Sequence, residues 1–418
     1  MRLEPLPTEQ SALDAAQDRS FAAMRDAIAA SETCTAYTRV VDALRPDRID
    51  EIEVLDRARL AAWGADAVAP NSITTGDVRI VLRSSGSSGS IRTVRHSAGF
   101  NDQVGFLGAR GIGMGGLPRN PLVVNALAPG DLFGGFGFAE DALARRGAAV
   151  LPAGSAMDPD ALADVMAGER VDAIVAVPGQ IGLLHARRPE AFDSIRVAYY
   201  LGDRPRRDLR SALAASGVEL RSFALSTTET GPIGFQCEHL SGPDHHLHED
   251  LVHVQILGPD GRPVPEGVLG TVAVTPLVDS GLALVRYLVG DEGTQLGRRC
   301  RCGSPSMVLR LGSREGTSTN IRGTLVTEAM VRGALPVASS DVQLVVEDDG
   351  QRFGLVLCGP GAAGVEDSTL APSFLAEPTL AKVLRTRGFA GIRIDRDRSP
   401  AHDRRGKQPF FFRGGTDR

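Results

Sequence analysis

Residues 171–203 read "VDAIVAVPGQIGLLHARRPEAFDSIRVAYYLGD", and two apolar runs within them decide the fold class. The runs "VDAIVAVPG" and "IRVAYYLGD" are rich in β-branched residues and are separated by a segment of helix length. Buried runs of this kind that alternate with helices are typical of parallel βαβ units. Further runs are "VRIVLRSS", "NPLVVNALA", "GAAVLPAG" and "GVELRSFAL". The sequence therefore predicts an α/β sheet layer over residues 78–230.

The flanking segments follow other patterns. Residues 11–30 place Leu13, Phe21, Met24 and Ile28 on one helical face, which predicts an N-terminal helix packed on the body. After residue 245, alternating apolar positions flank the turn "GPDGRPVPEG" and predict antiparallel hairpins. Residues 317–418 carry their own helices and strands, and Gly312 and Gly316 precede them. We therefore predict a large, multi-layer α/β domain over 1–313 with mixed sheets and helices, and a small α+β domain over 314–418 on a hinge.

Composition narrows the class of protein. The 418 residues are 42% hydrophobic, which is enough for a large core, and no 18 apolar residues follow one another. The net charge is −5 with acidic and basic residues spread along the chain, which argues against a nucleic-acid or membrane partner. We expect a cytoplasmic protein that acts on a small molecule; a homodimer is one of the assemblies left open.

The stretch "RSSGSSGS", residues 83–90, admits two interpretations. Gly and Ser residues make flexible linkers. The run also follows directly on the apolar strand "DVRIVL", and glycine backbone N–H groups with serine hydroxyls suit phosphate oxygens. No Gly-Lys-Ser/Thr ending of the Walker type is present. The residues alone leave the choice between linker and phosphate loop open.

Several motifs in order resemble those of the adenylate-forming superfamily, and more narrowly of the phenylacetate-CoA ligase family. "RSSGSSGS" is similar to that family's Ser/Thr/Gly-rich nucleotide loop, and "STTETGPIGFQCEH" is similar to its Thr-Glu stretch. "LHEDLVHVQIL", "GRPVPEGVLGTVAVTPL", "LVRYLVGDEGTQL", "RCRCG", "NIRG" and a near-terminal "GK" then follow in the family's order. The resemblance covers roughly residues 78–415. It implies ATP-dependent activation of a carboxylic acid as acyl-AMP, release of pyrophosphate and transfer of the acyl group to a thiol.

The resemblance implies a role for each matched position. Glu229 would hold Mg²⁺, Thr228 would contact the α-phosphate, and Asp291 would accept hydrogen bonds from the ribose. Without the family match, the alternative interpretation of Glu229 is a solvated carboxylate in a loop. The loop around the β- and γ-phosphates would be Ser84, Ser85, Gly86, Ser87, Ser88, Gly89 and Ser90. The other implied nucleotide contacts are Thr227, Arg314 and the adenine wall of Gly202, Asp203, Arg204 and Pro205. The loop "DLFGGFGF" lies at the family's acyl pocket, so Phe133, Phe136 and Phe138 are either pocket residues or core aromatics.

Lys407 is matched to the family's C-terminal catalytic lysine, which neutralises charge between the carboxylate and the α-phosphate. It is one of only two lysines among 46 basic residues, the other being Lys382. A lysine kept in an arginine-rich chain indicates a place where a compact charge on a slim stem is needed. The alternative is a solvated tail.

A cysteine and histidine cluster predicts a metal. Five of the eight histidines lie between Cys237 and residue 253, and "CRC" supplies Cys300 and Cys302. Three cysteines and one histidine make a tetrahedral site for structural zinc. By the family match His246 is the first choice of histidine and His239 the second. The alternative is three reduced thiols beside a His-rich loop.

The chain departs from the family at several points. Ser90 and Ile91 stand where Lys-Pro is common, Leu225 and Ser226 where an aromatic residue and glycine are common, and Arg314 is one position late. We expect an AMP-forming ligase that uses ATP and Mg²⁺ on a small, aromatic acid, with CoA as acceptor. One alternative is an enzyme of specialised metabolism that transfers to an amine, a hydroxyl or a carrier-protein thiol. The other is a non-catalytic nucleotide- or acyl-binding homologue.

Overall fold

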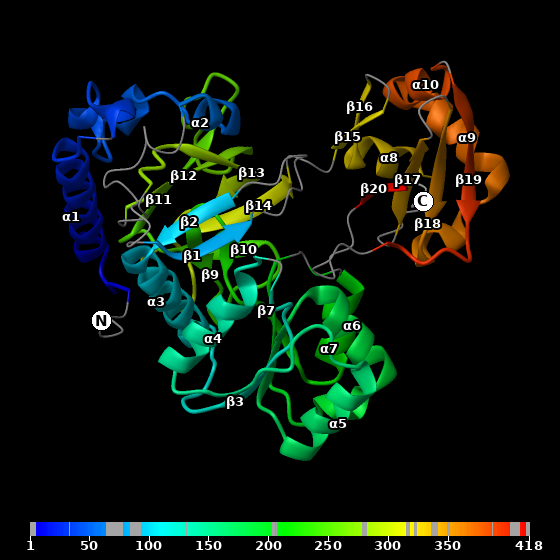
Figure 1. Cartoon of the computed structure of the whole chain (residues 1–418), viewed down its shortest axis with the longest axis horizontal. Coiled ribbons are helices and arrows are strands. Elements are labelled where there is room, and N and C mark those ends of the chain that lie inside the picture. Colours follow the sequence, from blue (N-terminus) through cyan, green and yellow to red (C-terminus); the bar gives the residue numbers. More distant parts are fainter. Residues whose placement is uncertain are drawn as a thin grey trace. The chain divides into compact units, whose positions relative to one another are not determined.

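The computed structural model divides the chain into two compact units, Met1–Ser313 and Arg314–Arg418 (Figure 1). Each unit is described by itself. The structure describes residues 6–414 except for 33, 64–77, 84–92, 131, 203–204, 206, 278–281, 315–317, 322–323, 336–341, 349–351, 387 and 402–409.

A five-stranded parallel sheet forms the predicted α/β layer of the first unit. Its order is β4-β3-β5-β6-β7. Every position of β5 and β6 is buried, which explains why these strands are continuous apolar runs without alternation. The strands are β3 (Leu122–Asn125), β4 (Ala149–Leu151), β5 (Ala173–Ala176), β6 (Val197–Tyr200) and β7 (Glu219–Ser222).

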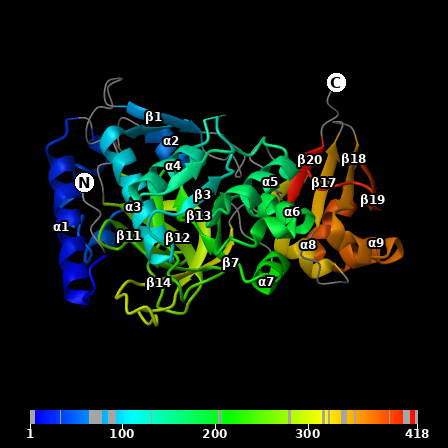
Figure 2. The ribbon, with the colours of Figure 1, turned by 90° about the horizontal axis from the view of Figure 1, so that it is seen from below.

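Helices cover both faces of this sheet (Figures 1 and 2). On one face α5 (Pro159–Glu169), α6 (Pro178–Arg187) and α7 (Arg207–Ala215) join one core cluster with the strands. On the other face α3 (Ala98–Met114) and α4 (Gly135–Arg145) join a second cluster. The predicted fold class is confirmed.

The strand predicted at residue 78 does not belong to the parallel sheet. β1 (Val78–Arg83) pairs antiparallel with β2 (Thr93–Ser97) in a two-stranded sheet of its own. The reason is the connection: residues 84–92 are fewer than the roughly dozen that a parallel crossover needs. This prediction was wrong for β1, and the hairpin instead lies beside α3 (Figure 1).

A second, seven-stranded sheet has the order β11-β12-β13-β14-β10-β9-β8. β11 and β12 pair antiparallel across the turn at residues 258–267, as the hairpin pattern predicted. Antiparallel pairs also join β12 to β13, β10 to β14, β10 to β9 and β8 to β9. The strands are β8 (Leu225–Thr227), β9 (Gly231–Phe235), β10 (Asp244–Leu247), β11 (Val252–Leu257), β12 (Gly270–Pro276), β13 (Tyr287–Gln295) and β14 (Val308–Arg314).

The N-terminal segment packs on this second sheet. α1 (Gln10–Ala29) buries Leu13, Phe21, Met24 and Ile28, the four residues that its periodicity predicted. Phe21, Met24 and Ile28 share a cluster with Leu277 and Val285, which flank the end of the sheet. The remaining helices here are the short η1 (Thr35–Tyr37), η2 (Val41–Ala43), η3 (Ile49–Glu51), α2 (Arg57–Trp63) and, in the parallel layer, η5 (Pro189–Phe192).

The second unit has a sheet of order β19-β18-β17-β20 with its own core. β17 and β18 form an antiparallel hairpin, and β19 and β20 add in parallel at either edge. The elements are β15 (Ser318–Ile321), β16 (Thr324–Thr327), α8 (Glu328–Ala334), β17 (Gln343–Asp348), β18 (Phe353–Cys358), η6 (Pro360–Gly364), α9 (Asp367–Ala376), α10 (Pro378–Leu384), β19 (Phe389–Asp395) and β20 (Phe411–Gly414).

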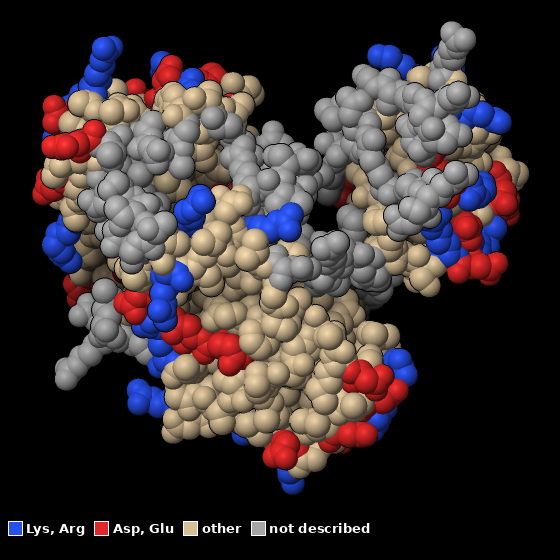
Figure 3. Space-filling view, viewed as in Figure 1, with Lys and Arg blue, Asp and Glu red and all other residues tan. Residues whose placement is uncertain are grey.

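The surface agrees with the spread of charge along the sequence. On the face drawn in Figure 3, basic and acidic side chains are interspersed over each unit. Among the helices of the described residues, none combines the length and the hydropathy that crossing a bilayer requires.

Candidate functional site

The carboxyl ends of the parallel strands carry the first part of the candidate site. Ligands in open α/β sheets bind at this edge. After β3, the buried Asn125 amide donates to Glu140 Oε1 at 2.7 Å and to the Phe136 carbonyl at 3.2 Å. Its Oδ1 accepts from Leu127 N at 3.3 Å. One buried side chain thus shapes the loop after β3 and the start of α4.

The Ser/Gly segment itself, Ser84–Ser90, lies outside the described residues, but both of its ends are placed. Arg83 N, at the end of β1, donates to the Leu132 carbonyl at 2.9 Å. The return strand begins at Thr93, directly opposite Arg83 in the hairpin register. The segment therefore starts next to the loop that precedes α4.

The Thr-Glu motif forms a closed turn between β8 and β9. Thr227 Oγ1 accepts from Thr230 N at 3.1 Å and lies 2.9 Å from Thr230 Oγ1. Gly231 follows with a φ of 67°, where its missing side chain also avoids Val104 and Phe100 of α3. Thr228 and Glu229 are at the tip of this turn. Both are half-buried.

A histidine that the sequence did not single out joins the hairpin to this turn. His96 Nε2 lies 2.8 Å from the Thr228 carbonyl oxygen, across 132 positions of sequence. The side chain is 4% exposed. The one local signal was the alternation on β2, which buries Val94 and His96 on the same face.

Asp291 lies on β13 within a bulge. Residues 289–291 face the single residue Val272 of β12, and Gly290 adopts a φ of 81°. The Asp291 side chain is buried. Arg314 is the last residue of β14, and Lys407 lies outside the described residues. Their predicted roles stay predictions.

The adenine wall and the acyl pocket are placed in part. Gly202 follows β6 with a φ of 86°, and Pro205 is described, whereas Asp203 and Arg204 lie outside the described residues. Phe136 and Phe138 pack against the core cluster that α3 and α4 share. Phe138 contacts Phe223 edge-on at 5.4 Å and fills the space left by Gly108 of α3. These contacts favour the core alternative for Phe138. Phe133 lies in the loop that precedes α4.

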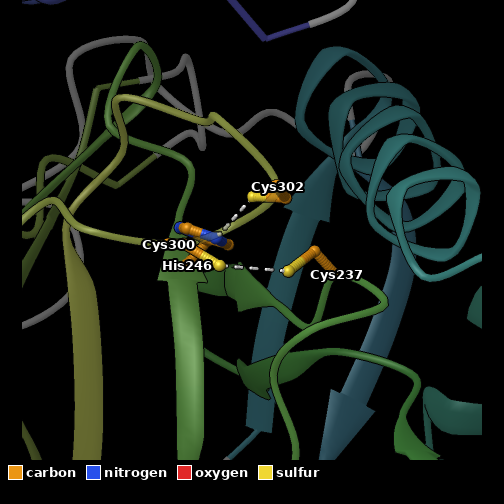
Figure 4. A group of neighbouring side chains, drawn as sticks. All are labelled: Cys237, His246, Cys300 and Cys302. Carbon is orange, nitrogen blue, oxygen red and sulfur yellow. Dashed lines mark hydrogen bonds between the residues drawn. The ribbon is translucent and has the colours of Figure 1, made fainter.

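The structure brings the four predicted metal ligands together (Figure 4). The ligand atoms of Cys237, His246, Cys300 and Cys302 all lie within 4.8 Å of one another. Cys237 Sγ is 3.6 Å from Cys300 Sγ, and Cys302 Sγ is 3.2 Å from His246 Nε2. Tetrahedral zinc with ordinary bond lengths needs separations of about 3.5–3.8 Å between its ligand atoms. His239, the second choice, is not part of the group.

Hydrogen bonds around the cluster suit a metal. His246 Nδ1 lies 3.1 Å from the Ser306 carbonyl, which can only accept, so Nδ1 carries the proton and Nε2 faces the thiols as a lone pair. Burial lowers the pKa of His246, which keeps the ring neutral. Backbone N–H groups two residues on donate to Cys237 Sγ and Cys302 Sγ, both at 3.4 Å. Without a metal, burial raises the pKa of the Cys237 thiol to about 12.

The segment that carries Cys300 and Cys302 is tied down on both sides. Arg298 pairs with Glu249 at 2.6 Å, and Glu249 also accepts from Met307 N at 2.7 Å. Opposite, the buried Arg221 of β7 donates to the Cys237 carbonyl at 2.6 Å. The cluster therefore links the segment before β14 to the loop after β9, and through Arg221 to the parallel sheet.

A separate cavity of about 700 Å³ lies at the opposite, amino-terminal edge of the parallel strands. Charged side chains line it, among them Arg170, Asp172, Arg196 and Glu219. None of the predicted site residues does.

No protein-family model matches the chain. A phenylacetate-coenzyme A ligase of Thermus thermophilus is 31% identical over 112 residues, which is a quarter of either protein. A solved 2-hydroxyisobutyryl-CoA ligase, in complex with 2-HIB-AMP, has a TM-score of 0.72 at 16% identity over 99% of this chain and 91% of its own. The chain has the fold of the adenylate-forming ligases.

This fold confirms the resemblance that the ordered motifs indicated. A further solved structure, the O-succinylbenzoate coenzyme A synthetase from Bacillus subtilis with ATP and magnesium, has a TM-score of 0.53 at 15% identity over 78% of this chain and 68% of its own. The low identities agree with a divergent chain.

Proposed function

We propose that this protein is an ATP-dependent, AMP-forming ligase that activates a small carboxylic acid and transfers the acyl group to CoA. The observation that carries the proposal is the contact between His96 and the Thr228 carbonyl, within the fold of the adenylate-forming ligases. That contact joins the hairpin that bears the Ser/Gly loop to the turn that bears Thr228 and Glu229. The contact spans 132 positions of sequence and supports the proposal that the hairpin and the turn contribute to one site.

The proposed chemistry rests on positioning and charge neutralisation. The Ser84–Ser90 loop binds the β- and γ-phosphates, and Asp291 accepts hydrogen bonds from the ribose. Thr228 contacts the α-phosphate that the substrate carboxylate attacks. Glu229 holds Mg²⁺, which neutralises charge on the phosphates when bound. Among the described residues the Glu229 carboxylate has no hydrogen-bond or ion-pair partner, which leaves it available to a cation.

Lys407 completes the proposed adenylation site. Its ammonium group offsets the negative charge that grows between the attacking carboxylate and the α-phosphate, and AMP is then the leaving group when the thiol attacks. Because the carboxylate and the phosphate are both anionic, this step needs a compact cation that fits between them. Arg314, at the start of the second unit, is the proposed ribose contact.

For the acid we propose a small aryl carboxylate. The 31% identity to a phenylacetate-coenzyme A ligase supports this class, although that match spans only a quarter of the relative's length. The aromatic residues Phe133 and Phe136 lie at the loop and helix start that shape the same edge of the sheet. Transfer to an amine, a hydroxyl or a carrier-protein thiol is the second candidate, because Ser90 and Leu225 depart from the residues common in CoA ligases.

The test is acid-dependent pyrophosphate release with a panel of aryl and short aliphatic acids, with and without CoA. We expect release with at least one aryl acid and formation of its CoA thioester. Release that CoA neither accelerates nor converts to a thioester would move the assignment to another acceptor. No acid-dependent release with any acid would instead support a binding protein. A cytoplasmic location and a homodimer stay predictions.

We further propose that Cys237, His246, Cys300 and Cys302 hold a structural zinc ion. The closed set of four ligands leaves no position for a substrate, and the proton on His246 Nδ1 directs the ring lone pair toward the thiols. Elemental analysis of protein purified without added metal should give about one zinc per chain. Less than half an equivalent would favour three reduced thiols.

A further inference from the structure

His96 joins the hairpin of β1 and β2 to the turn that carries Thr228 and Glu229. It belongs to β2, the strand that returns from the Ser/Gly loop, and pairs with Ile80 of β1. Its side chain leaves the hairpin and reaches the turn that carries Thr228 and Glu229.

The chemistry of the contact determines the state of the ring. A carbonyl oxygen only accepts, so His96 Nε2 carries the proton and donates to Thr228 O at 2.8 Å. Nδ1 is buried and has no hydrogen-bond partner among the described residues. The ring therefore makes one directed hydrogen bond. Burial lowers the pKa of His96, which agrees with a neutral ring.

The His96 ring also packs against an aromatic residue of α3. It contacts Phe100 edge-on, with centroids 4.7 Å apart and planes at 82°. Phe100 lies in the first turn of α3, where its backbone N–H donates to the capping Ser97 hydroxyl at 3.1 Å. Because Ser97 directly follows His96, the same two residues tie β2 to α3 and to the turn. A side chain held in this way keeps the turn at a defined position relative to β2 and α3.

Two contacts hold the turn, one within it and one to the hairpin. Thr227 closes it internally through Thr230, which determines its shape. The contact with His96 anchors the Thr228 carbonyl to a different sheet, which determines where the turn points. Thr228 Oγ1 and the Glu229 carboxylate extend from the residues on either side of the anchored peptide.

We propose that His96 is a positioning residue for adenylation, which holds the Thr228–Glu229 turn against the hairpin of β1 and β2. This inference rests on the proposed function for its kinetic consequence. Its structural part is independent of turnover, since it predicts that loss of the His96 donor weakens binding of Mg²⁺ and nucleotide together. Misplacement of a reacting group by about 1 Å costs about 100-fold in rate.

The experiment compares three variants with the wild type. His96→Phe keeps a buried ring but removes the donor, and His96→Gln keeps an N–H donor near the position of Nε2. The control His253→Phe makes the same change at another histidine that contacts a phenylalanine edge-on, Phe21 at 5.3 Å, far along the second sheet. Thermal unfolding of each variant reports on folding.

We expect His96→Phe to lower kcat for acid-dependent pyrophosphate release by about 10- to 100-fold with little change in KM for the acid. His96→Gln should stay within about threefold of the wild type, and His253→Phe should have wild-type kcat at pH 7.5. A wild-type kcat in His96→Phe, or an equal loss in His96→Gln, would overturn the proposal.

A binding measurement separates this proposal from the proposed function. Calorimetric titration with a non-hydrolysable ATP analogue, with and without Mg²⁺, should show a roughly 10-fold weaker Mg²⁺-dependent affinity in His96→Phe and not in His96→Gln. If the variants differ in this way but the wild type shows no turnover with any acid, the ligase assignment fails, and the role of His96 in positioning the turn for Mg²⁺ and nucleotide stands. If the wild type shows no Mg²⁺-dependent binding, both fail.

Discussion

At the scale of single residues, the candidate site depends on polar groups held by backbone partners. The Thr227 hydroxyl closes the turn on Thr230 N, the His96 ring holds the Thr228 carbonyl, and the Asn125 amide holds the loop after β3. The Glu229 carboxylate lies at the tip of a turn that Thr227 and His96 hold in place.

Glu229→Gln tests the proposed magnesium ligand. The amide keeps the shape of the side chain but removes the charge that attracts a hard cation. We expect kcat/KM for pyrophosphate release to fall by about 100-fold or more, and the Mg²⁺ concentration needed for half-maximal rate to rise. Glu238→Gln, at an exposed glutamate nine positions on, should leave both quantities unchanged. An unaltered Mg²⁺ dependence in Glu229→Gln would assign the carboxylate to solvent.

Lys407→Arg tests the C-terminal lysine with a change of shape and not of charge. Because a planar guanidinium cannot take the place of a compact ammonium between two anions, we expect acid-dependent pyrophosphate release to fall by about 100-fold. Binding of the ATP analogue should change less than threefold. Lys382→Arg is the matched control, since Lys382 is the other lysine of the chain and lies in the last turn of α10. Equal activity of the two variants would support the solvated-tail alternative.

At the scale of elements, the long connection between β13 and β14 shows how loops far apart in sequence are joined. Cys300 and Cys302 on this connection meet His246 of β10 and Cys237 after β9, and Arg298 adds an ion pair to Glu249. Burial raises the pKa of the Cys237 thiol, and partial burial raises that of the half-buried Cys302 thiol, so proton release accompanies any zinc binding there. The connection is therefore expected to lose its anchor when the metal is lost.

Cys300→Ser tests this anchor. We expect the zinc content to fall from about one equivalent to below half, and the unfolding midpoint of the first unit to drop by roughly 5–10 °C. Protease cleavage between residues 296 and 306 should become faster, because the segment loses two of its attachments. Cys358→Ser, at a cysteine of the second unit, should keep the zinc. A full equivalent of zinc in Cys300→Ser would show that Cys300 is not a ligand.

At the scale of the whole molecule, the two units differ in their titratable groups. The first unit contains histidines with lowered pKa values, among them His96. Burial and the nearby Arg286 lower the pKa of His253 to about 4, and Asp50 has the opposite, smaller effect. The described part of the second unit contains no histidine. There, Arg393 and Arg398 lower the pKa of Glu347. Acid should therefore act on the first unit at a higher pH than on the second.

Protonation of His253 lowers the stability of the first unit as the pH falls. In the unfolded chain a histidine has an ordinary pKa near 6.5, whereas folded His253 has a pKa of about 4. Between these two values the unfolded chain binds a proton that the folded chain does not, so the free energy of unfolding falls as the pH falls through this window. From pH 7 to pH 5 we expect His253 alone to cost about 2 kcal/mol. Calorimetry at both pH values, with hydrogen exchange to assign the transitions, should show the first unit shifting more. In His253→Phe the loss of stability between pH 7 and pH 5 should be smaller by about 2 kcal/mol. A loss equal to that of the wild type would contradict the assignment of this pH dependence to His253.

Much of the architecture could be predicted from local patterns. The buried face of α1 and the β5 and β6 runs were readable because helix and strand periodicity depend only on nearby residues. The hairpin of β1 with β2 was missed, because an apolar run does not reveal its pairing partner. The ordered motifs indicated the fold because each is a short stretch that its own residues identify.

By itself, then, the sequence determined the fold class, the motif order and the pool of candidate ligands. Only the tertiary structure decided that His246 and not His239 faces the three cysteines, that Phe138 packs against Gly108, and that His96 meets Thr228. The physical reason is sequence separation. Side-chain periodicity and turn chemistry act over a few residues, whereas each of these contacts depends on how separate elements pack in three dimensions.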